Sequence, residues 1–248
     1  MIRESSLKAS AFLSETKALA HPAFENLGLG ERRTEPLVAL FLDLTNFTGR
    51  TFWDDQEETV DLAHAILSGF IEVVLKFGGH PLGLRGDGLF AGFSPGDPSA
   101  TGAFALAAAA FALDGIQQEV NPKLKARGID PVQARAGLDY GNITFVRSGS
   151  ITDSEVNPLG FAANFAAKCE KYANSWEIVV GENLKNSLDG GSAIFEEHAK
   201  SPKSYTRDYE TKKYRFYQYK WKNIVPFLEN VISELDGNFT SDIVKIEG

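Results

Sequence analysis

The alternation of apolar and polar stretches predicts where the first strand and helix of the core lie. Leu37–Leu42 is a continuous apolar run between Pro36 and Asp43, which is typical of a strand buried on both faces. Asp54–Lys76 begins with an acidic turn and continues with apolar residues at helical spacing, so it predicts an amphipathic helix. A Gly-Gly pair follows this helix and marks its end.

The middle of the chain predicts a hairpin, a helix and further strands. Two short apolar segments, Pro81–Leu84 and Leu89–Phe93, flank a Gly-Asp-Gly turn, as expected of a β-hairpin. Ser99 is a candidate N-cap for an alanine-rich helix that runs to about Val120. Val132–Val146 alternates around two glycines and predicts two strands joined by a tight turn or a bulge.

The remaining segments complete an order of β-α-β-β-α-β(β)-α-β. We expect a helical lead-in over 1–35 that ends in the charged linker Gly28–Pro36, a helix at Leu159–Tyr172, a strand at Glu177–Val180, an aromatic and basic hairpin at Tyr205–Trp221, and a terminal helix at Ile224–Leu235. This order predicts an α+β fold, a ferredoxin-like βαββαβ sheet with one helix-covered face. The expected units are a helical extension (1–35), a catalytic domain (36–222), and a C-terminal helix and tail (223–248).

Composition narrows the class of protein. A chain of 248 residues with 43% hydrophobic and 23% charged residues is typical of a soluble globular protein. Its net charge of −8 argues against a general nucleic-acid-binding surface, although a nucleotide substrate remains compatible with it. Cys169 is the only cysteine, so no disulfide forms within the chain. No apolar run approaches the length of a membrane span, and we expect a cytoplasmic protein that does not contact a membrane.

Two aspartates occur where apolar runs break, and they are the first candidates for chemistry. If the hairpin that carries Asp87 lies beside the strand that ends at Asp43, their carboxylates lie close together and repel. Two Mg²⁺ or Mn²⁺ ions shared with a triphosphate would remove that repulsion. The turn at Leu44–Gly49 would offer free backbone N–H groups to phosphate oxygens. The alternative is that each aspartate is an ordinary turn residue.

Four motifs, in order, resemble the class III nucleotide cyclase catalytic domain. They are FLDLTNFT, RGDGLFAGF, ARAGLDYGNITF and NPLGFAANFAAKCEKYA, and they span about Leu37–Val180. The resemblance implies that Asp43 and Asp87 are metal ligands, with Leu44 beside them, and that the phosphate turn includes Asn46, Phe47 and Thr48. It implies cyclisation of a nucleoside triphosphate with release of pyrophosphate.

The same resemblance assigns two residues on the later helix. Asn164 falls on the asparagine that orients the ribose, and Lys168 falls where the family usually has an arginine that steadies the transition-state phosphate. Lysine supplies the charge without the planar fork of arginine. Because family sites form between two subunits, the resemblance implies a homodimer in which Asp43 and Asp87 face Asn164 and Lys168 of the second copy.

The base-recognition positions depart from those of purine cyclases. Gly83 and Asn157 occupy them, and glycine has no side chain to read a purine, whereas an asparagine amide pairs with uracil or cytosine. Arg50 could reach the base as a donor that favours UTP over CTP; alternatively it is an exposed arginine paired with Asp54 or Asp55. These departures resemble the bacterial pyrimidine cyclases of Pycsar anti-phage systems, whose product activates a separate effector. The other interpretations are an atypical adenylyl or guanylyl cyclase, a non-catalytic nucleotide-binding homologue and, least favoured, an RNA-binding module.

Overall fold

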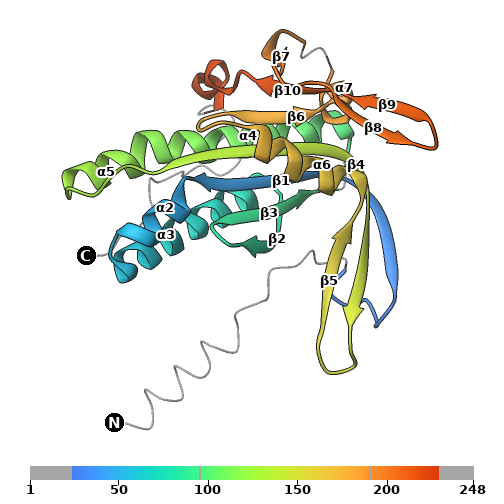
Figure 1. Ribbon diagram of the computed structural model, residues 1–248, viewed down its shortest axis with the longest axis horizontal. Helices are drawn as coiled ribbons and strands as arrows, with labels where there is room; N and C mark the ends of the chain where they lie inside the picture. The colour runs from blue at the N-terminus through green and yellow to red at the C-terminus, as the bar shows by residue number, and fades with distance from the viewer. Residues whose placement is uncertain (1–23, 95, 190–191, 229–248) are drawn as a thin grey trace.

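The computed structural model describes residues 24–94, 96–189 and 192–228 (Figure 1). Its strands are β1 (Arg32–Thr45), β2 (His80–Arg85), β3 (Gly88–Phe93), β4 (Gln133–Gly149), β5 (Ser154–Leu159), β6 (Ile178–Gly181), β7 (Phe195–Glu197), β8 (Lys203–Arg207), β9 (Glu210–Tyr214) and β10 (Phe216–Tyr219). Its α-helices are α2 (Phe47–Trp53), α3 (Gln56–Lys76), α4 (Pro98–Gly115), α5 (Asn121–Ala126), α6 (Phe161–Tyr172) and α7 (Glu182–Ser187). A π-helical segment, Ile116–Val120, joins α4 to α5.

The main sheet has the order β2-β3-β1-β4-β6-β10-β7, and β5 pairs with β4 outside this path. Strand β1 is antiparallel to both β3 and β4, whereas β4 and β6 are parallel. The order along the chain confirms the predicted α+β arrangement. Strands β8 and β9 form a separate hairpin, as predicted, while β10 joins the main sheet.

Helices cover both faces of the sheet, so the expectation of one helix-covered face is wrong. Val38 and Leu40 of β1 belong to the core that packs against α3 and α4. Leu37 and Ala39 point the other way, into a smaller core that includes alanines of α6. Alternate residues of a strand point to opposite faces, which is why a continuous apolar run in β1 requires helices on both sides.

Strand β4 corrects a second prediction, because it is one 17-residue strand without an internal turn. It pairs with β1 from Gln133 to Val146 without any shift in register. Its glycine at Gly137 allows the close approach of α6: a Cβ there would lie 2.0 Å from the backbone nitrogen of Glu170. Gly137, which suggested a turn, is therefore needed because a side chain there would collide with the backbone of α6.

Several boundaries differ by a few residues. The predicted linker is already strand from Arg32, because these residues pair with the projecting end of β4. Helix α3 confirms the prediction closely, and Asp55 caps it by accepting from two backbone N–H groups. Helix α4 is capped by Asp97 rather than by Ser99. Residues 225–228 are helical, and residues 229–235 of the predicted terminal helix lie outside the described residues, as do residues 1–23 of the lead-in predicted over 1–35.

One described helical segment, Pro98–Ala126, is long and apolar enough by composition to cross a membrane. In the structure its α4 portion is a core helix, and most of its alanines are buried. The apolar composition of this segment is therefore accounted for by packing against the sheet.

Candidate active site

Asp43 and Asp87 lie side by side at one end of the central strands. Asp43 is near the end of β1 and pairs in register with Gly88, the first residue of β3. Asp87 occupies the turn before Gly88, and its carbonyl accepts a 3.4 Å hydrogen bond from the backbone N–H of Leu44. Burial raises the pKa of Asp87, and the charge of Asp43 raises it further. The structure thus brings together the two carboxylates that the sequence singled out.

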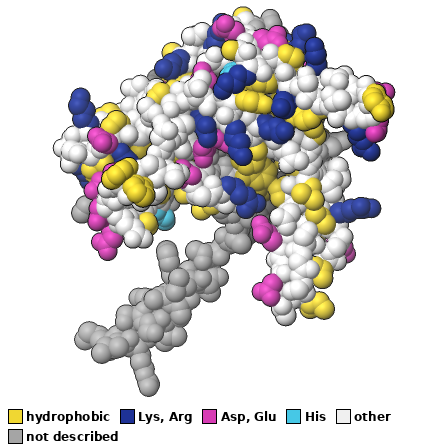
Figure 2. Space-filling view, in the orientation of Figure 1, with side chains coloured by type: hydrophobic (Ala, Val, Ile, Leu, Met, Phe, Trp, Pro, Cys, Tyr) yellow, Lys and Arg dark blue, Asp and Glu magenta, His cyan; other side chains and the backbone are white. Residues whose placement is uncertain are grey.

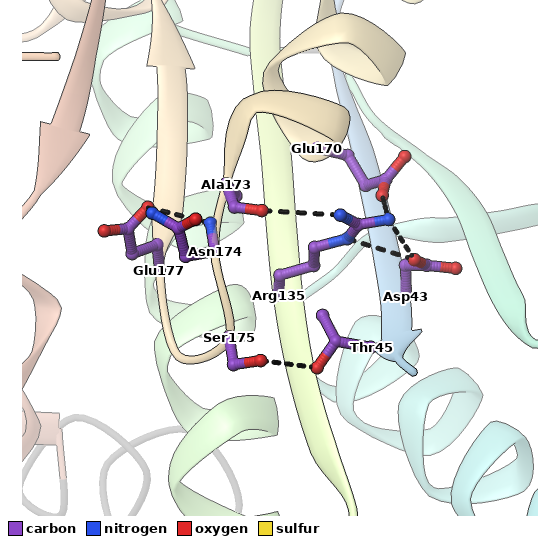
Figure 3. Close-up of polar contacts among 8 residues, drawn as sticks. All are labelled: Asp43, Thr45, Arg135, Glu170, Ala173, Asn174, Ser175 and Glu177. Atoms are coloured by element: carbon purple, nitrogen blue, oxygen red, sulfur yellow. Dashed lines mark hydrogen bonds and ion pairs between the residues drawn. The ribbon is translucent and has the colours of Figure 1, made fainter. Parts of the chain in front are cut away.

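An arginine and a glutamate that the sequence did not single out complete this cluster (Figure 3). Arg135 lies opposite Asp43 on β4, and its Nε and Nη2 donate to Asp43 Oδ2 at 3.1 and 2.8 Å. Arg135 Nη2 also lies 2.6 Å from Glu170 Oε1, near the end of α6. Arg135 belongs to the ARAGLD motif, but only the strand register shows that its partner is Asp43.

The cluster holds more negative charge than one guanidinium neutralises. Burial raises the pKa of Glu170 to about 7, and the neighbouring carboxylate of Asp43 adds to this, while Arg135 offsets only part of the increase. A divalent cation beside Asp43 and Asp87 would therefore enter a region that is short of positive charge.

The donor set suits magnesium or manganese in the presence of a triphosphate. Within the described residues, no group of three or more His, Cys, Asp or Glu side chains could hold a metal ion by itself. Mg²⁺ commonly uses one or two carboxylates and takes its other ligands from water and substrate phosphates. Asp43, Asp87 and the backbone of Leu44 match that pattern.

The predicted phosphate turn is shorter than expected. Asn46 has a left-handed backbone, with φ of 60°, and α2 begins at the next residue, Phe47. Phe47 is buried, whereas Thr48 is exposed. No side chain caps the N-terminus of α2, so the first-turn N–H groups have no partner within the helix.

Asn164 and Lys168 lie one turn apart on α6. The side chain of Asn164 is exposed and that of Lys168 is half-buried. The Lys168 ammonium lies 5.2 Å from the ring centroid of Tyr205, on β8. Figure 2 shows several Lys and Arg side chains on the face of the molecule that carries α6.

Gly83 and Asn157 lie on β2 and β5, and an ion pair between Arg85 and Glu155 joins these two strands. An added Cβ on Gly83 of β2 would lie 3.9 Å from the guanidinium of Arg85. Arg85 Nη2 lies 3.9 Å from Glu155 Oε1 on β5, and the Asn157 amide donates to the carbonyl of Glu155 at 3.2 Å.

Arg50 lies elsewhere in the protomer. Its Nε is 3.3 Å from Asp54 Oδ2, and its Nη2 donates to the carbonyl of Asp130 at 2.5 Å. Its side chain is 10% exposed, so the alternative of an exposed arginine is wrong, although the pairing with Asp54 is confirmed. Arg50 lines a cavity of about 300 Å³ together with Asp130 and Gln133. Asp55 caps α3 instead.

A buried carboxylate farther along β4 was also missed. Asp139 is fully buried and accepts hydrogen bonds from the Tyr214 hydroxyl at 2.9 and 3.1 Å. The backbone N–H groups of Tyr140 and Leu184 donate to it at 2.9 and 3.4 Å. Burial raises its pKa to about 7. The indication in the sequence was a charged residue between Leu138 and Tyr140 in a predicted strand.

Comparison with solved structures defines the class of fold. The adenylyl cyclase CyaB from P. aeruginosa matches with a TM-score of 0.66 and 20% identity, over 76% of this chain and 95% of that one. The guanylyl cyclase Cya2 matches with a TM-score of 0.63 and 19% identity, over 77% of this chain and 94% of that one. The protein therefore has the fold of the class III nucleotide cyclases.

Two curated proteins are similar to this chain in sequence. A cytidylate cyclase from Escherichia coli is 25% identical over 185 residues, which cover 71% of this chain and 40% of that protein. A cytidylate cyclase from Staphylococcus aureus is 23% identical over 158 residues, or 62% and 37% of the two chains. The chain spans about two fifths of the length of these relatives. No family model matches the sequence. The chain thus has the fold of the class III nucleotide cyclases and is similar in sequence to part of two cytidylate cyclases.

Proposed function

We propose that the protein converts a pyrimidine nucleoside triphosphate into its 3′,5′-cyclic monophosphate and pyrophosphate. The observation that carries the proposal is the juxtaposition of Asp43 and Asp87 at the end of β1, on the fold of a nucleotide cyclase. The relation to two cytidylate cyclases supports a pyrimidine substrate.

Asp43, Asp87 and the backbone carbonyl of Leu44 would hold two divalent cations, Mg²⁺ or Mn²⁺. When bound, these ions would lower the pKa of the ribose 3′-hydroxyl and neutralise the triphosphate. Arg135 orients Asp43 through two hydrogen bonds. The backbone N–H groups at the start of α2, around Phe47 and Thr48, would bind phosphate oxygens.

In the reaction, the 3′-hydroxyl gives its proton to water and its oxygen attacks the α-phosphorus to form an O3′–P bond. The bond from the α-phosphorus to the oxygen that bridges to the β-phosphorus breaks, and pyrophosphate leaves. Catalysis of this kind depends on positioning and on charge stabilisation. Asn164 would orient the ribose and Lys168 would neutralise charge on the transferring phosphate. Both side chains reach the surface of α6, which suits a site completed by a second copy of the chain in a homodimer.

The base pocket would lie between β2 and β5. Gly83 leaves a space without a side chain, and Asn157 supplies an amide that can pair with uracil or cytosine. UTP is the favoured substrate in this proposal and CTP the alternative. Arg50 forms an ion pair and a hydrogen bond within its own protomer. These contacts weaken the argument that Arg50 selects UTP over CTP.

The biological role that we propose is synthesis of a second messenger in bacterial anti-phage defence. The cyclic nucleotide would activate a separate effector protein. This part of the proposal rests on the resemblance of the motifs to those of Pycsar cyclases.

The decisive experiment incubates the purified protein with each of the four nucleoside triphosphates and Mn²⁺ and identifies the product by mass spectrometry. We expect cyclic UMP or cyclic CMP, no product after chelation of the metal, and a loss of at least about 100-fold in Asp43→Asn and Asp87→Asn. Asp208→Asn is the matched control, because Asp208 is an exposed aspartate on the β8–β9 turn. Cyclic AMP or cyclic GMP alone would establish a purine cyclase instead. Nucleotide binding without any product would establish a binding module.

A further inference from the structure

The β8–β9 hairpin packs its aromatic side chains against α6, the helix that carries Asn164 and Lys168. The Tyr214 ring lies 4.8 Å from the ring of Phe161 and 4.5 Å from that of Phe165. Tyr205 makes an edge contact with Phe161 at 6.0 Å. These distances are in the range of favourable aromatic pairs, so the hairpin has a defined position on the helix.

Lys168 lies against this hairpin. Its ammonium is 5.2 Å from the ring centroid of Tyr205, within the distance at which a cation is attracted to an aromatic face. Lysine is a point charge on a flexible stem of four carbons, so it loses considerable rotamer entropy when it must act at one place. An aromatic ring under the ammonium reduces the number of positions that the charge occupies.

The hairpin that supplies the ring is itself anchored to the core. The Tyr214 hydroxyl donates to Asp139, which is fully buried, and accepts from the backbone N–H of Asn183 at 3.1 Å. Tyr205 pairs in register with Lys212 across the hairpin, and the hydroxyls of Thr206 and Thr211 lie 2.9 Å apart. The strand that carries Tyr205 is therefore held by contacts independent of Lys168, and its ring also contacts Phe161.

We propose that Tyr205 is a positioning residue for Lys168 and that the β8–β9 hairpin contributes to catalysis through this one side chain. Tyr205 acts through the lysine and does not touch the substrate. The proposal rests on the proposed cyclase function, in which Lys168 stabilises the transferring phosphate. It explains how a flexible lysine serves at a position where a rigid arginine fork would be self-orienting.

The test compares Tyr205→Leu with Tyr205→Phe in the 248-residue chain, using whichever triphosphate is cyclised. We expect Tyr205→Phe to retain wild-type kcat, because it keeps the ring. We expect Tyr205→Leu to lower kcat by about three- to tenfold with little change in KM. Tyr209→Ser, at the fully exposed tip of the hairpin, is the matched control and should leave both constants unchanged.

A double-mutant cycle separates positioning from a purely structural role. In a Lys168→Met background, Tyr205→Leu should cause no further loss of kcat, because the charge that Tyr205 positions is absent. An equal loss in both backgrounds would overturn the proposal, since it would show that the ring supports the fold. An unchanged kcat in Tyr205→Leu alone would also overturn it.

A spectroscopic measurement on the free protein tests the contact itself. With ¹³C-methylated lysines, the Lys168 methyl resonance should be shifted upfield by the ring, and the shift should persist in Tyr205→Phe and vanish in Tyr205→Leu. Absence of the shift in an active wild-type enzyme would refute the positioning role alone. A wild-type protein that cyclises none of the four triphosphates would refute the cyclase function, and the role of Tyr205 with it.

Discussion

Asp139→Asn isolates the energetic cost of the buried carboxylate on β4. Asp139 is fully buried, and it accepts hydrogen bonds from the Tyr214 hydroxyl and from the backbone N–H groups of Tyr140 and Leu184. Asparagine has the same shape, can accept from the same N–H groups and can donate to the Tyr214 oxygen. The substitution therefore removes the ionisable carboxyl group while it preserves the packing around position 139.

The magnitude follows from the pKa values in the two states. Burial raises the pKa of Asp139 from 3.8 to about 7, against the lowering effect of its hydrogen bonds, and the nearby charge of Glu182 adds to the increase. Between about pH 4 and pH 7 the unfolded chain has lost this proton and the folded protein retains it, so the free energy of unfolding falls as the pH rises. The full difference is about 4 kcal/mol, since each pKa unit corresponds to roughly 1.4 kcal/mol. Typical domains have only about 5–15 kcal/mol of stability.

The assay is urea unfolding followed by tryptophan fluorescence at constant ionic strength between pH 5.5 and 8.5. We expect the stability of Asp139→Asn relative to wild type to increase with pH by about 2 kcal/mol over this range and to level off above about pH 7.5. The comparison between variants cancels the titration of other groups, including Glu170. Asp208→Asn should show no such trend. A difference between Asp139→Asn and wild type that does not vary with pH would refute the reasoning.

Three further predictions concern packing, charge and capping. Gly137→Ala places a Cβ 2.0 Å from the backbone nitrogen of Glu170, so α6 must move; we expect a loss of about 2 kcal/mol or more in urea unfolding, and wild-type stability would contradict the described contact. Arg135→Gln leaves Asp43 and Glu170 without their shared cation, and after allowance for partial exposure we expect a loss of about 2 kcal/mol. In thermal-shift measurements without nucleotide, Mn²⁺ should stabilise this variant more than wild type, and an equal gain would count against a metal at Asp43. Asp97→Ala removes the N-cap of α4 and should cost about 1 kcal/mol, whereas Ser99→Ala, which removes no cap, should cost less in the same unfolding assay.

Local pattern was sufficient for most of the secondary structure. The apolar run of β1, the helical stripe of α3 and the Gly-Asp-Gly turn between β2 and β3 each depend on neighbouring residues, so their elements could be predicted closely. The approach of Asp43 to Asp87 was also predictable, because a hairpin beside a strand places its turn at the strand's end.

The local sequence pattern gave wrong or incomplete predictions where the role of a residue depends on an element distant in the chain. The glycine at position 137 suggested a turn, and only the packing of α6 on β4 shows that it makes room for a helix. The sequence left open whether Arg50 reaches a base or pairs with Asp54 or Asp55, and only the fold places the backbone carbonyl of Asp130 where it accepts from the guanidinium.

By itself, the sequence determined the order of elements and the residue types available for metal and nucleotide chemistry. The tertiary structure alone decided which of them meet: Arg135 with Asp43 and Glu170, Asp139 with Tyr214, and Lys168 with Tyr205. The physical reason is that these contacts join residues distant in the chain. Their distances are set by strand register and helix packing, which no local pattern of hydrophobicity specifies.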